Sequence, residues 1–219
     1  MSTALHLHRD PPPPRGRLDP ETVLGPDPDH RAPVRQAPLP TTGAHPPLWA
    51  VLGAHGGAGT STLARWWAPA ADTGLAWPAC PHTTQRVLIA ARLCIPGLTA
   101  AAERLREWHS GCAPDGIAVI GLALTPTRPG SVPAPVRRYR SVVAELVEQI
   151  YDIGWHDELL VRELGELAQY NPLTPAPPAR RRSRLTETVP PDVSRAGADI
   201  VSRTAANQIA GQKSSEARL

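Results

Sequence analysis

The sequence predicts an α/β domain in which a small, mainly parallel sheet is flanked by helices. Several short runs are apolar throughout, as expected of strands that are covered on both faces of a sheet. Amphipathic segments of helical period separate these runs. Strands that alternate with helices are typical of a parallel sheet built by right-handed crossovers.

The first strand is expected at "LWAVLGA", where an apolar run ends in glycines. Further strands are expected at "RVLIAAR", at "GIAVIGLALTP" and at the shorter "QIYDIGW". The expected strands occupy residues 48–54, 86–92, 116–125 and 149–153. The segment "ADTGLAWPACPHTTQ" between the first two is rich in turn residues, so we interpret it as a linker.

Helices are expected between and after these strands. The first spans residues 61–68, the second covers "IPGLTAAAERLREWHSG", the third covers "PAPVRRYRSVVAELV", and the last follows a cap at Asp157. The apolar faces expected for the last three consist of Leu98, Ala101, Leu105 and Trp108; of Val136, Tyr139, Val143 and Leu146; and of Leu160, Leu164 and Leu167. The charged residues expected to point outward are Glu103, Arg104, Glu107, Arg137, Arg138 and Arg140.

The two ends of the chain differ from this core in composition. The protein has 27 prolines among its 219 residues, and they crowd both ends. Polar, Pro-rich segments bury too little apolar surface to offset the entropy lost on ordering them. We therefore expect disordered tails at residues 1–46 and 172–219 around a domain of residues 47–171, with at most a short helix near 198–210.

Charge gives little indication of a nucleic-acid partner. The net charge is only +3, whereas nucleic-acid-binding proteins concentrate basic residues on one face. The basic run Arg180–Arg184 lies in a Pro-flanked tail, where a solvated segment is expected and a contact with nucleic acid or a membrane surface is the alternative. No long apolar run resembles a signal peptide or a membrane span, so we expect a cytoplasmic protein.

Cysteine usage agrees with that compartment. Cys80, Cys94 and Cys112 form no CxxC pair, which argues against a disulfide framework. Cys80 and His82 lack a second pair at ligand spacing, so no structural metal is expected.

The stretch "LGAHGGAGTSTLARWW" places a glycine loop between the first strand and the first helix. Backbone N–H groups converge at such a turn, and glycines leave room for a phosphate. We expect a phosphate to be held by the loop, with the hydroxyl groups helping. The candidate binding residues are His55, Gly56, Gly57, Ala58, Gly59, Thr60, Ser61 and Thr62.

"AHGGAGTST" resembles the phosphate-binding loop of the P-loop NTPases of the ParA/MinD type. Gly56, Gly57 and Gly59 match glycines of the pattern, and Ser61 falls on the position whose hydroxyl coordinates magnesium. The resemblance implies a P-loop NTPase-like fold and ATP with Mg²⁺ as the bound cofactor. Three departures stand out: Ala54 takes the place of the first glycine, His55 that of the signature lysine, and Thr60 that of the loop lysine.

These departures point to a degenerate P-loop protein with weak or no hydrolysis. Transfer of a phosphoryl group needs charge neutralisation that Thr60 does not supply, and the only lysine is Lys213. Arg65, Arg92 or an arginine of a partner subunit are the candidate replacements. None of the apolar strands ends in the aspartate of a Walker B element.

Residues 47–160 also resemble an uncharacterised family of P-loop-like proteins of high-GC actinobacteria, encoded near plasmid or integrative-element genes. The phrases "LGAHGGAGTSTLA" and "AWP" carry this resemblance. It implies a fold and a genomic neighbourhood, and through the latter a link to plasmid or mobile-element maintenance, but no activity.

Two further hypotheses stay open. One is a non-catalytic interaction module, in which the glycine loop is structural and the tails recruit an unidentified protein partner. The other is an NAD(P)-binding oxidoreductase, because Gly53, Gly57 and Gly59 also spell GxxxGxG. Against it, no tyrosine has a lysine four residues on, and "RVLIAAR" ends in Arg92 where an acidic ribose ligand is expected. His55 is either a phosphate donor or a surface histidine.

The turn after the last strand offers a second place for ligand contacts. Trp155 and Asp157 lie where open α/β sheets bind ligands, although Asp157 also suits a helix cap.

Overall fold

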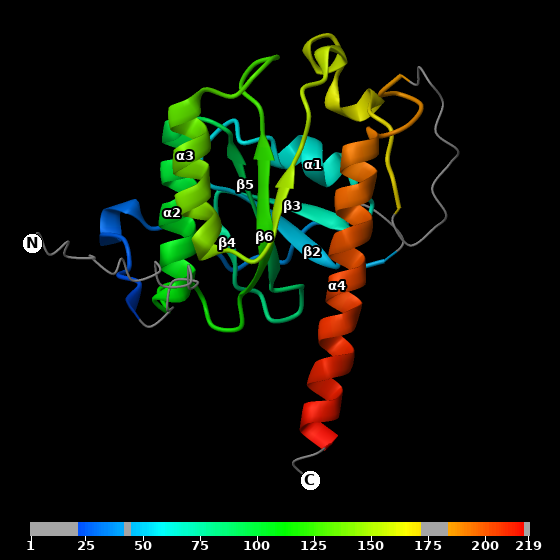
Figure 1. Cartoon of the computed structure of the whole chain (residues 1–219). Coiled ribbons are helices and arrows are strands. Elements are labelled where there is room, and N and C mark those ends of the chain that lie inside the picture. Colours follow the sequence, from blue (N-terminus) through cyan, green and yellow to red (C-terminus); the bar gives the residue numbers. More distant parts are fainter. Residues whose placement is uncertain (1–21, 42–44, 172–183, 217–219) are drawn as a thin grey trace, which may run out of the picture.

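The protein folds around a five-stranded sheet with helices on both faces (Figure 1). The computed structural model describes residues 22–41, 45–171 and 184–216, with side chains up to residue 206. The strand order is β3-β2-β5-β6-β7, and every neighbouring pair is parallel. The strands are β2 (Trp49–Gly53), β3 (Ala70–Gly74), β5 (Arg86–Arg92), β6 (Ala118–Thr125) and β7 (Ile150–Asp152). The predicted α/β class and the four predicted strands are confirmed.

Strand β3 corrects the interpretation of its segment as a linker. Ala70–Gly74 pairs with β2 along the edge of the sheet, and Ala70 and Ala71 are buried. Shortly after it, β4 (Trp77–Pro78) pairs with β1 (Val34–Arg35) in a separate two-stranded sheet. An edge strand takes its hydrogen bonds from its neighbour, so its turn-rich composition did not prevent pairing.

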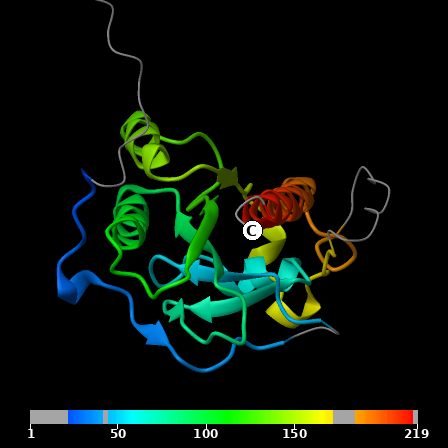
Figure 2. The ribbon, with the colours of Figure 1, turned by 90° about the horizontal axis from the view of Figure 1, so that it is seen from below.

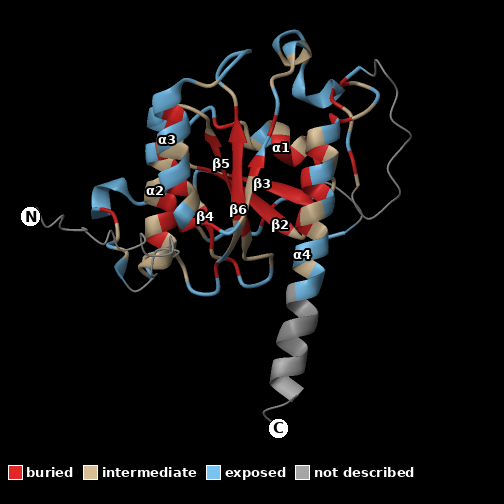
Figure 3. Ribbon diagram, viewed as in Figure 1, coloured by how far each residue is buried: buried red, intermediate tan, exposed pale blue. Residues whose placement is uncertain are grey.

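Helices cover the two faces of the sheet separately. Helices α1 (Thr60–Trp66) and α4 (Pro191–Glu216) lie on one face, and α2 (Ile95–His109) and α3 (Ala134–Val143) lie on the other (Figures 1 and 2). Successive strand residues point to opposite faces, so each strand contributes to two apolar layers. Figure 3 shows the resulting burial along the strands.

The apolar faces predicted for α2 and α3 hold in outline. Leu98, Ala101 and Leu105 are fully buried. Val136 and Val143 are also buried, with 8% and 1% of their surface exposed. Trp108 and Tyr139 are only partly buried at the margin of the same layer. After α3 the chain continues in the 3₁₀ turn η3 (Ala144–Leu146), whose Leu146 is buried.

Residues 22–41 are docked on α2, which differs from the disordered tail predicted there. The outward position expected for Arg104 and Glu107 is also wrong, because this segment buries both. They form an ion pair of 2.9 Å, the N–H of Ala32 donates to the Glu107 carboxylate at 3.2 Å, and Arg104 donates to the carbonyl of His30. The segment supplies hydrogen-bond partners to this buried pair, although Arg104 Nε has none among the described residues. Residues 1–21 lie outside the described residues.

The C-terminal region also holds more structure than predicted. Helix α4 spans 26 residues where at most a short helix was expected. Val193, Ala196 and Ile200 are buried against the sheet, and the Trp67 indole N–H donates to the carbonyl of Val193 at 2.9 Å. Residues 172–183, including most of the basic run, lie outside the described residues.

The last predicted helix is replaced by two 3₁₀ turns, η4 (Asp157–Leu160) and η5 (Leu164–Glu166). Between them the backbone of Glu163 is extended, and this residue forms a capping box with Glu166 that starts the second turn anew. Asp157 caps nothing, since its carboxylate accepts the Trp155 indole N–H at 2.5 Å. Leu160 and Leu164 are exposed, by 71% and 44%, and only Leu167 is buried.

Candidate functional site

The glycine loop lies at the carboxyl end of β2, next to β5. From β2 the chain passes through α1 to β3 on one side, whereas β5 lies on the other side. Successive strands are therefore added on opposite sides of β2, and the loop lies at this switch point of the sheet. In open α/β sheets, ligands bind outside the carboxyl ends of the strands at such a switch point.

The glycines give the loop a backbone that other residues resist. Gly57 and Gly59 have φ angles of 76° and 94°, in the left-handed region. A Cβ atom added at Gly56 or Gly57 would meet nothing within 4 Å, so this side of the loop is open. Gly53 is the opposite case, because an added Cβ would lie 3.0 Å from Leu75.

Side chains from neighbouring strands hold the loop by its carbonyl groups. Arg92 at the end of β5 donates from Nε to the carbonyl of Gly57 at 2.8 Å. Thr125 at the end of β6 donates to the carbonyl of Ala58 at 3.1 Å. These contacts fix the loop without using its N–H groups.

His55 is occupied within the protein. Its Nε2 accepts the backbone N–H of Arg92 at 3.1 Å, which places the ring proton on Nδ1. Nδ1 lies 2.8 Å from the carbonyl of Gly56 and donates to it. The neutral ring therefore ties the loop to β5, which favours a structural role over donation to a phosphate.

The two arginines considered as replacements for the loop lysine lie in different places. Arg65 points away from the loop and donates to the carbonyls of Leu167 and Gly165, at 2.9 and 3.2 Å. Arg92 lies on the loop, and its Nη1 donates to the carbonyl of Pro126 at 2.8 Å. Arg92 is therefore the cation that the fold brings to the glycines.

An acidic residue that the sequence analysis missed also lies beside the loop. The Ser61 hydroxyl donates to Asp72 Oδ2 at 2.5 Å, and the other oxygen of Asp72 accepts the N–H of Gly74 at 2.8 Å. Asp72 belongs to β3. Because this segment was interpreted as a linker, the sequence analysis did not place Asp72 beside the loop. The apolar pair that precedes it, Ala70 and Ala71, was the available signal.

Asp72 also occupies the place of the acidic ribose ligand that a dinucleotide-binding fold requires. The strand that follows the first helix is β3, not the strand that ends in Arg92. The acidic residue expected on that strand is therefore present, 19 residues after Gly53.

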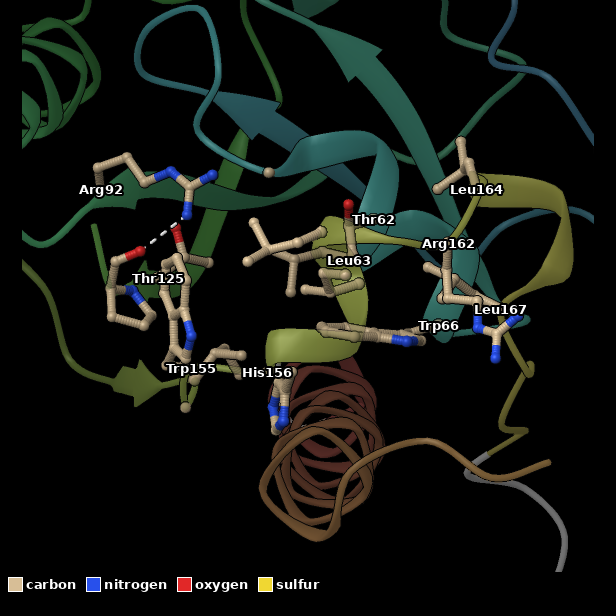
Figure 4. A pocket seen from close by; sticks show the side chains of 16 residues that line it. Thr62, Leu63, Trp66, Arg92, Thr125, Trp155, His156, Arg162, Leu164 and Leu167 are labelled. Carbon is tan, nitrogen blue, oxygen red and sulfur yellow. Dashed lines mark hydrogen bonds between the residues drawn. The ribbon is translucent and has the colours of Figure 1, made fainter. Parts of the chain in front are cut away.

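Beside the loop lies a cavity of about 330 Å³ (Figure 4). It is bounded by α1, by the ends of β5 and β6, and by the turns after β7. Of the predicted site residues, Gly59 and Thr62 line it, together with Trp155. Thr60 is partly buried and Ser61 is exposed, outside this cavity. Its volume falls within the range typical of small-molecule sites, roughly 300–1,000 Å³.

Other candidate sites gain little from the structure. Cys80 is buried, Cys94 and Cys112 are partly buried, and all three are free thiols. Nowhere in the described part of the chain do three or more His, Cys, Asp or Glu side chains cluster so that they could hold a metal ion. Among the described residues, no helix combines the length and apolar character needed to span a membrane.

Comparisons of the chain with protein-family models, with curated proteins and with solved structures found no match.

Proposed function

We propose that the glycine loop binds the phosphates of a nucleotide, with weak or no hydrolysis. The observation that supports this most is the way in which the loop is held. His55, Arg92 and Thr125 all bond its carbonyl groups, and the glycine side of the loop is open. The N–H of Ala58 donates to the carbonyl of His55 at 3.3 Å. A loop otherwise fixed by its carbonyls keeps its other N–H groups for an anion.

The cation of the site is Arg92. A guanidinium group offers several donors in a planar fork, so two bonds to carbonyls still leave N–H groups for a phosphate oxygen. This charge compensates in part for Thr60 at the usual lysine position. Helix α1 has only seven residues, so its dipole adds little beyond the loop.

Ser61 and Asp72 are the residues that would hold a magnesium ion. Hydroxyl and carboxylate oxygens are the hard donors that Mg²⁺ takes beside a phosphate. Their 2.5 Å hydrogen bond places both oxygens at one point next to the loop. When bound, the ion would neutralise phosphate charge.

Weak hydrolysis follows from what the loop lacks. Thr60 carries no charge to stabilise the transferred phosphoryl group, and Arg92 compensates for this only in part. The loop therefore suits binding better than catalysis. We further propose that such binding serves plasmid or mobile-element maintenance, as the resemblance of the loop implies.

Calorimetric titration with Mg²⁺-ATP, ADP and GTP, paired with a phosphate-release assay on the same sample, tests this function. Gly57→Val should abolish binding, because a β-branched residue resists a φ of 76° and crowds the anion. Gly111→Val is the matched control, since Gly111 has a φ of 72° and equally open surroundings outside the loop. Thr60→Lys should strengthen binding.

Two results would contradict the proposal. Absence of binding at about 1 mM of every nucleotide would leave the loop structural and the chain an interaction module. Rapid magnesium-dependent phosphate release that is lost in Ser61→Ala would show an active hydrolase.

A dinucleotide is the second candidate ligand, and Asp72 is the observation that favours it. In dinucleotide-binding folds an acidic residue about 20 residues after the first glycine bonds a ribose hydroxyl. Asp72→Asn separates the two candidates. It should weaken the magnesium dependence of ATP binding if Asp72 serves the metal, or weaken NAD⁺ binding if it serves a ribose.

A further inference from the structure

The cavity is separate from the open side of the glycine loop. The residues that the proposed phosphate and magnesium contacts require lie outside its lining: Gly56, Gly57, Ser61 and Asp72. Ser61 bonds to β3, whereas the cavity lies at the ends of β5 and β6 and at the turns after β7 (Figure 4). The cavity therefore has room for a ligand other than the phosphates of a nucleotide.

The walls of the cavity are mainly apolar. Leu63 and Trp66 contribute apolar surface from α1, and Leu159 contributes it from η4. Trp155 adds an indole whose N–H is already taken by Asp157, so this ring offers the cavity its apolar surface. Removing apolar surface from water is favourable, so such walls favour the carbon skeleton of a ligand.

Two leucines that line the cavity are exposed to water. Leu160 and Leu164 have 71% and 44% of their surface accessible, so they lie where the cavity opens. Exposed apolar side chains that surround a cavity are typical of a ligand-binding site. An apolar ligand in the cavity would cover part of both leucines.

The walls offer few partners for the polar edge of a nucleobase. Trp66 Nε1 and Arg162 Nε are buried within the wall and do not open onto the cavity. The Nη atoms of Arg162 lie 3.8 Å from Glu158 and 3.5 Å from Glu166, so its charge is already paired. A base buried here would leave donors and acceptors without partners, which costs free energy.

Arg92 gives the cavity one uncompensated positive charge. Its Nε and Nη1 donate to the carbonyls of Gly57 and Pro126, both at 2.8 Å. Its Nη2 forms no hydrogen bond or ion pair with a described residue, and none of the described residues that line the cavity is acidic. A guanidinium beside apolar walls is most stable when an anion pairs with it.

From this arrangement we infer that the cavity binds a small carboxylic acid with an apolar body, whose carboxylate pairs with Arg92. The inference goes beyond the proposed nucleotide binding and does not depend on it. The apolar body lies between α1 and the turns after β7, where Leu63 and Trp155 contact it. Arginine suits the carboxylate because its planar donors match the two carboxylate oxygens.

Calorimetric titration of the full-length protein with phenylacetate tests this inference. Phenylacetamide keeps the apolar body but lacks the charge, and acetate keeps the charge but lacks the body. Phenylacetate should bind about tenfold more tightly than the amide, because a hydrogen bond to a charged group is roughly twice as strong as a neutral one. It should also bind about tenfold or more tightly than acetate, because the phenyl group is buried.

Variants assign the two parts of the ligand to their contacts. Arg92→Met should bring the ratio of acid to amide affinity toward one, and Arg65→Met, which lies away from the loop, should leave the ratio unchanged. Leu160→Glu should weaken phenylacetate severalfold relative to Leu160→Gln, because only the first places a like charge where the cavity opens. The same pair of changes at Val142, which is exposed on α3, is the control.

The outcomes separate this inference from the proposed function. Failure of nucleotides and pyrophosphate to bind would refute the phosphate site and leave this inference intact. Absence of phenylacetate binding at about 10 mM, or equal affinity for acid and amide, would overturn the inference alone. A ratio that persists in Arg92→Met, with thermal unfolding within a few degrees of the wild type, would overturn the pairing with Arg92. Displacement of phenylacetate by a lower concentration of adenosine would assign the cavity to a nucleobase instead.

Discussion

Replacing Arg92 by methionine tests whether this residue supplies the charge of the glycine loop. Methionine keeps much of the length of the side chain and removes every donor. The hydrogen bonds to Gly57 and Pro126, both 2.8 Å long, are lost with the positive charge. The variant should bind phosphate groups more weakly and remain folded.

The magnitude follows from the type of bond. A hydrogen bond to a charged group contributes about 1.5–3 kcal/mol, which corresponds to a loss of roughly 10- to 150-fold in affinity. The two bonds to carbonyls contribute about 1 kcal/mol each to the free energy of unfolding. For a chain of this size the midpoint of thermal unfolding should therefore fall by only several degrees, roughly 2–4 °C per kcal/mol.

Pyrophosphate is the appropriate ligand for this assay, because it reaches the loop without occupying the cavity beside it. Calorimetry at about 0.05 M and 0.3 M salt should show a smaller salt dependence in Arg92→Met, since salt screens the contribution of an exposed charge. Arg92→Lys should bind with intermediate affinity, because it keeps the charge but loses the planar fork.

Arg65→Met is the matched control, since Arg65 also donates to two carbonyls but lies away from the loop. It should bind pyrophosphate as the wild type does. If the affinity of Arg92→Met for pyrophosphate lies within twofold of that of the wild type, Arg92 only stabilises the loop, and its charge does not contribute to ligand binding.

Two further predictions concern stability. Glu107→Ala should lower the free energy of unfolding by about 3–5 kcal/mol, because it leaves Arg104 buried without its partner. Urea denaturation measures this loss, and a loss below about 1 kcal/mol would contradict the prediction. Burial raises the pKa of Asp192, but His156 and the N–H of Gly154 lower it by more, so its pKa lies below the ordinary value. The ionised form is thus favoured by folding, and its contribution to stability is complete above about pH 4 and is lost as the pH falls further. Asp192→Asn should flatten this acid limb of the stability profile, and an unchanged acid limb would refute the assignment.

The sheet was predictable where burial leaves a local pattern. Strands β2, β5 and β6 are covered on both faces, so each is a continuous apolar run in the sequence. Strand β3 at the edge has no such run, and Asp72 and Gly74 read locally as turn residues. Its pairing is decided by β2, which lies about 20 residues earlier in the chain.

The docked ends of the chain were hidden for a different reason. Arg104 and Glu107 look like solvent-facing charges on an amphipathic helix. Only their partners in the N-terminal segment make them buried, and a contact across more than 70 residues has no local signal. The segment contains no α-helix among its described residues, in agreement with its proline content, but that content does not exclude docking.

The candidate site was predictable in part. Glycine spacing after an apolar run located the loop, because a strand followed by glycines and a helix forms one compact unit. Thr125, Asp72 and Arg162 come from segments 10 to more than 100 residues away, and only the topology brings them to the loop and the cavity. The choice between Arg65 and Arg92 likewise depended on side-chain direction.

Helix α4 has a consequence for the order in which the protein is made. Its Val193 and Ile200 complete an apolar layer whose other members include Trp49 and Trp67, which leave the ribosome about 130 to 150 residues earlier. Until α4 emerges, that face of the sheet lacks part of its cover, and the Trp67 indole N–H lacks its acceptor, the carbonyl of Val193. The nascent chain thus carries an unprotected apolar surface through most of translation, a state in which chaperones bind and partially folded chains associate.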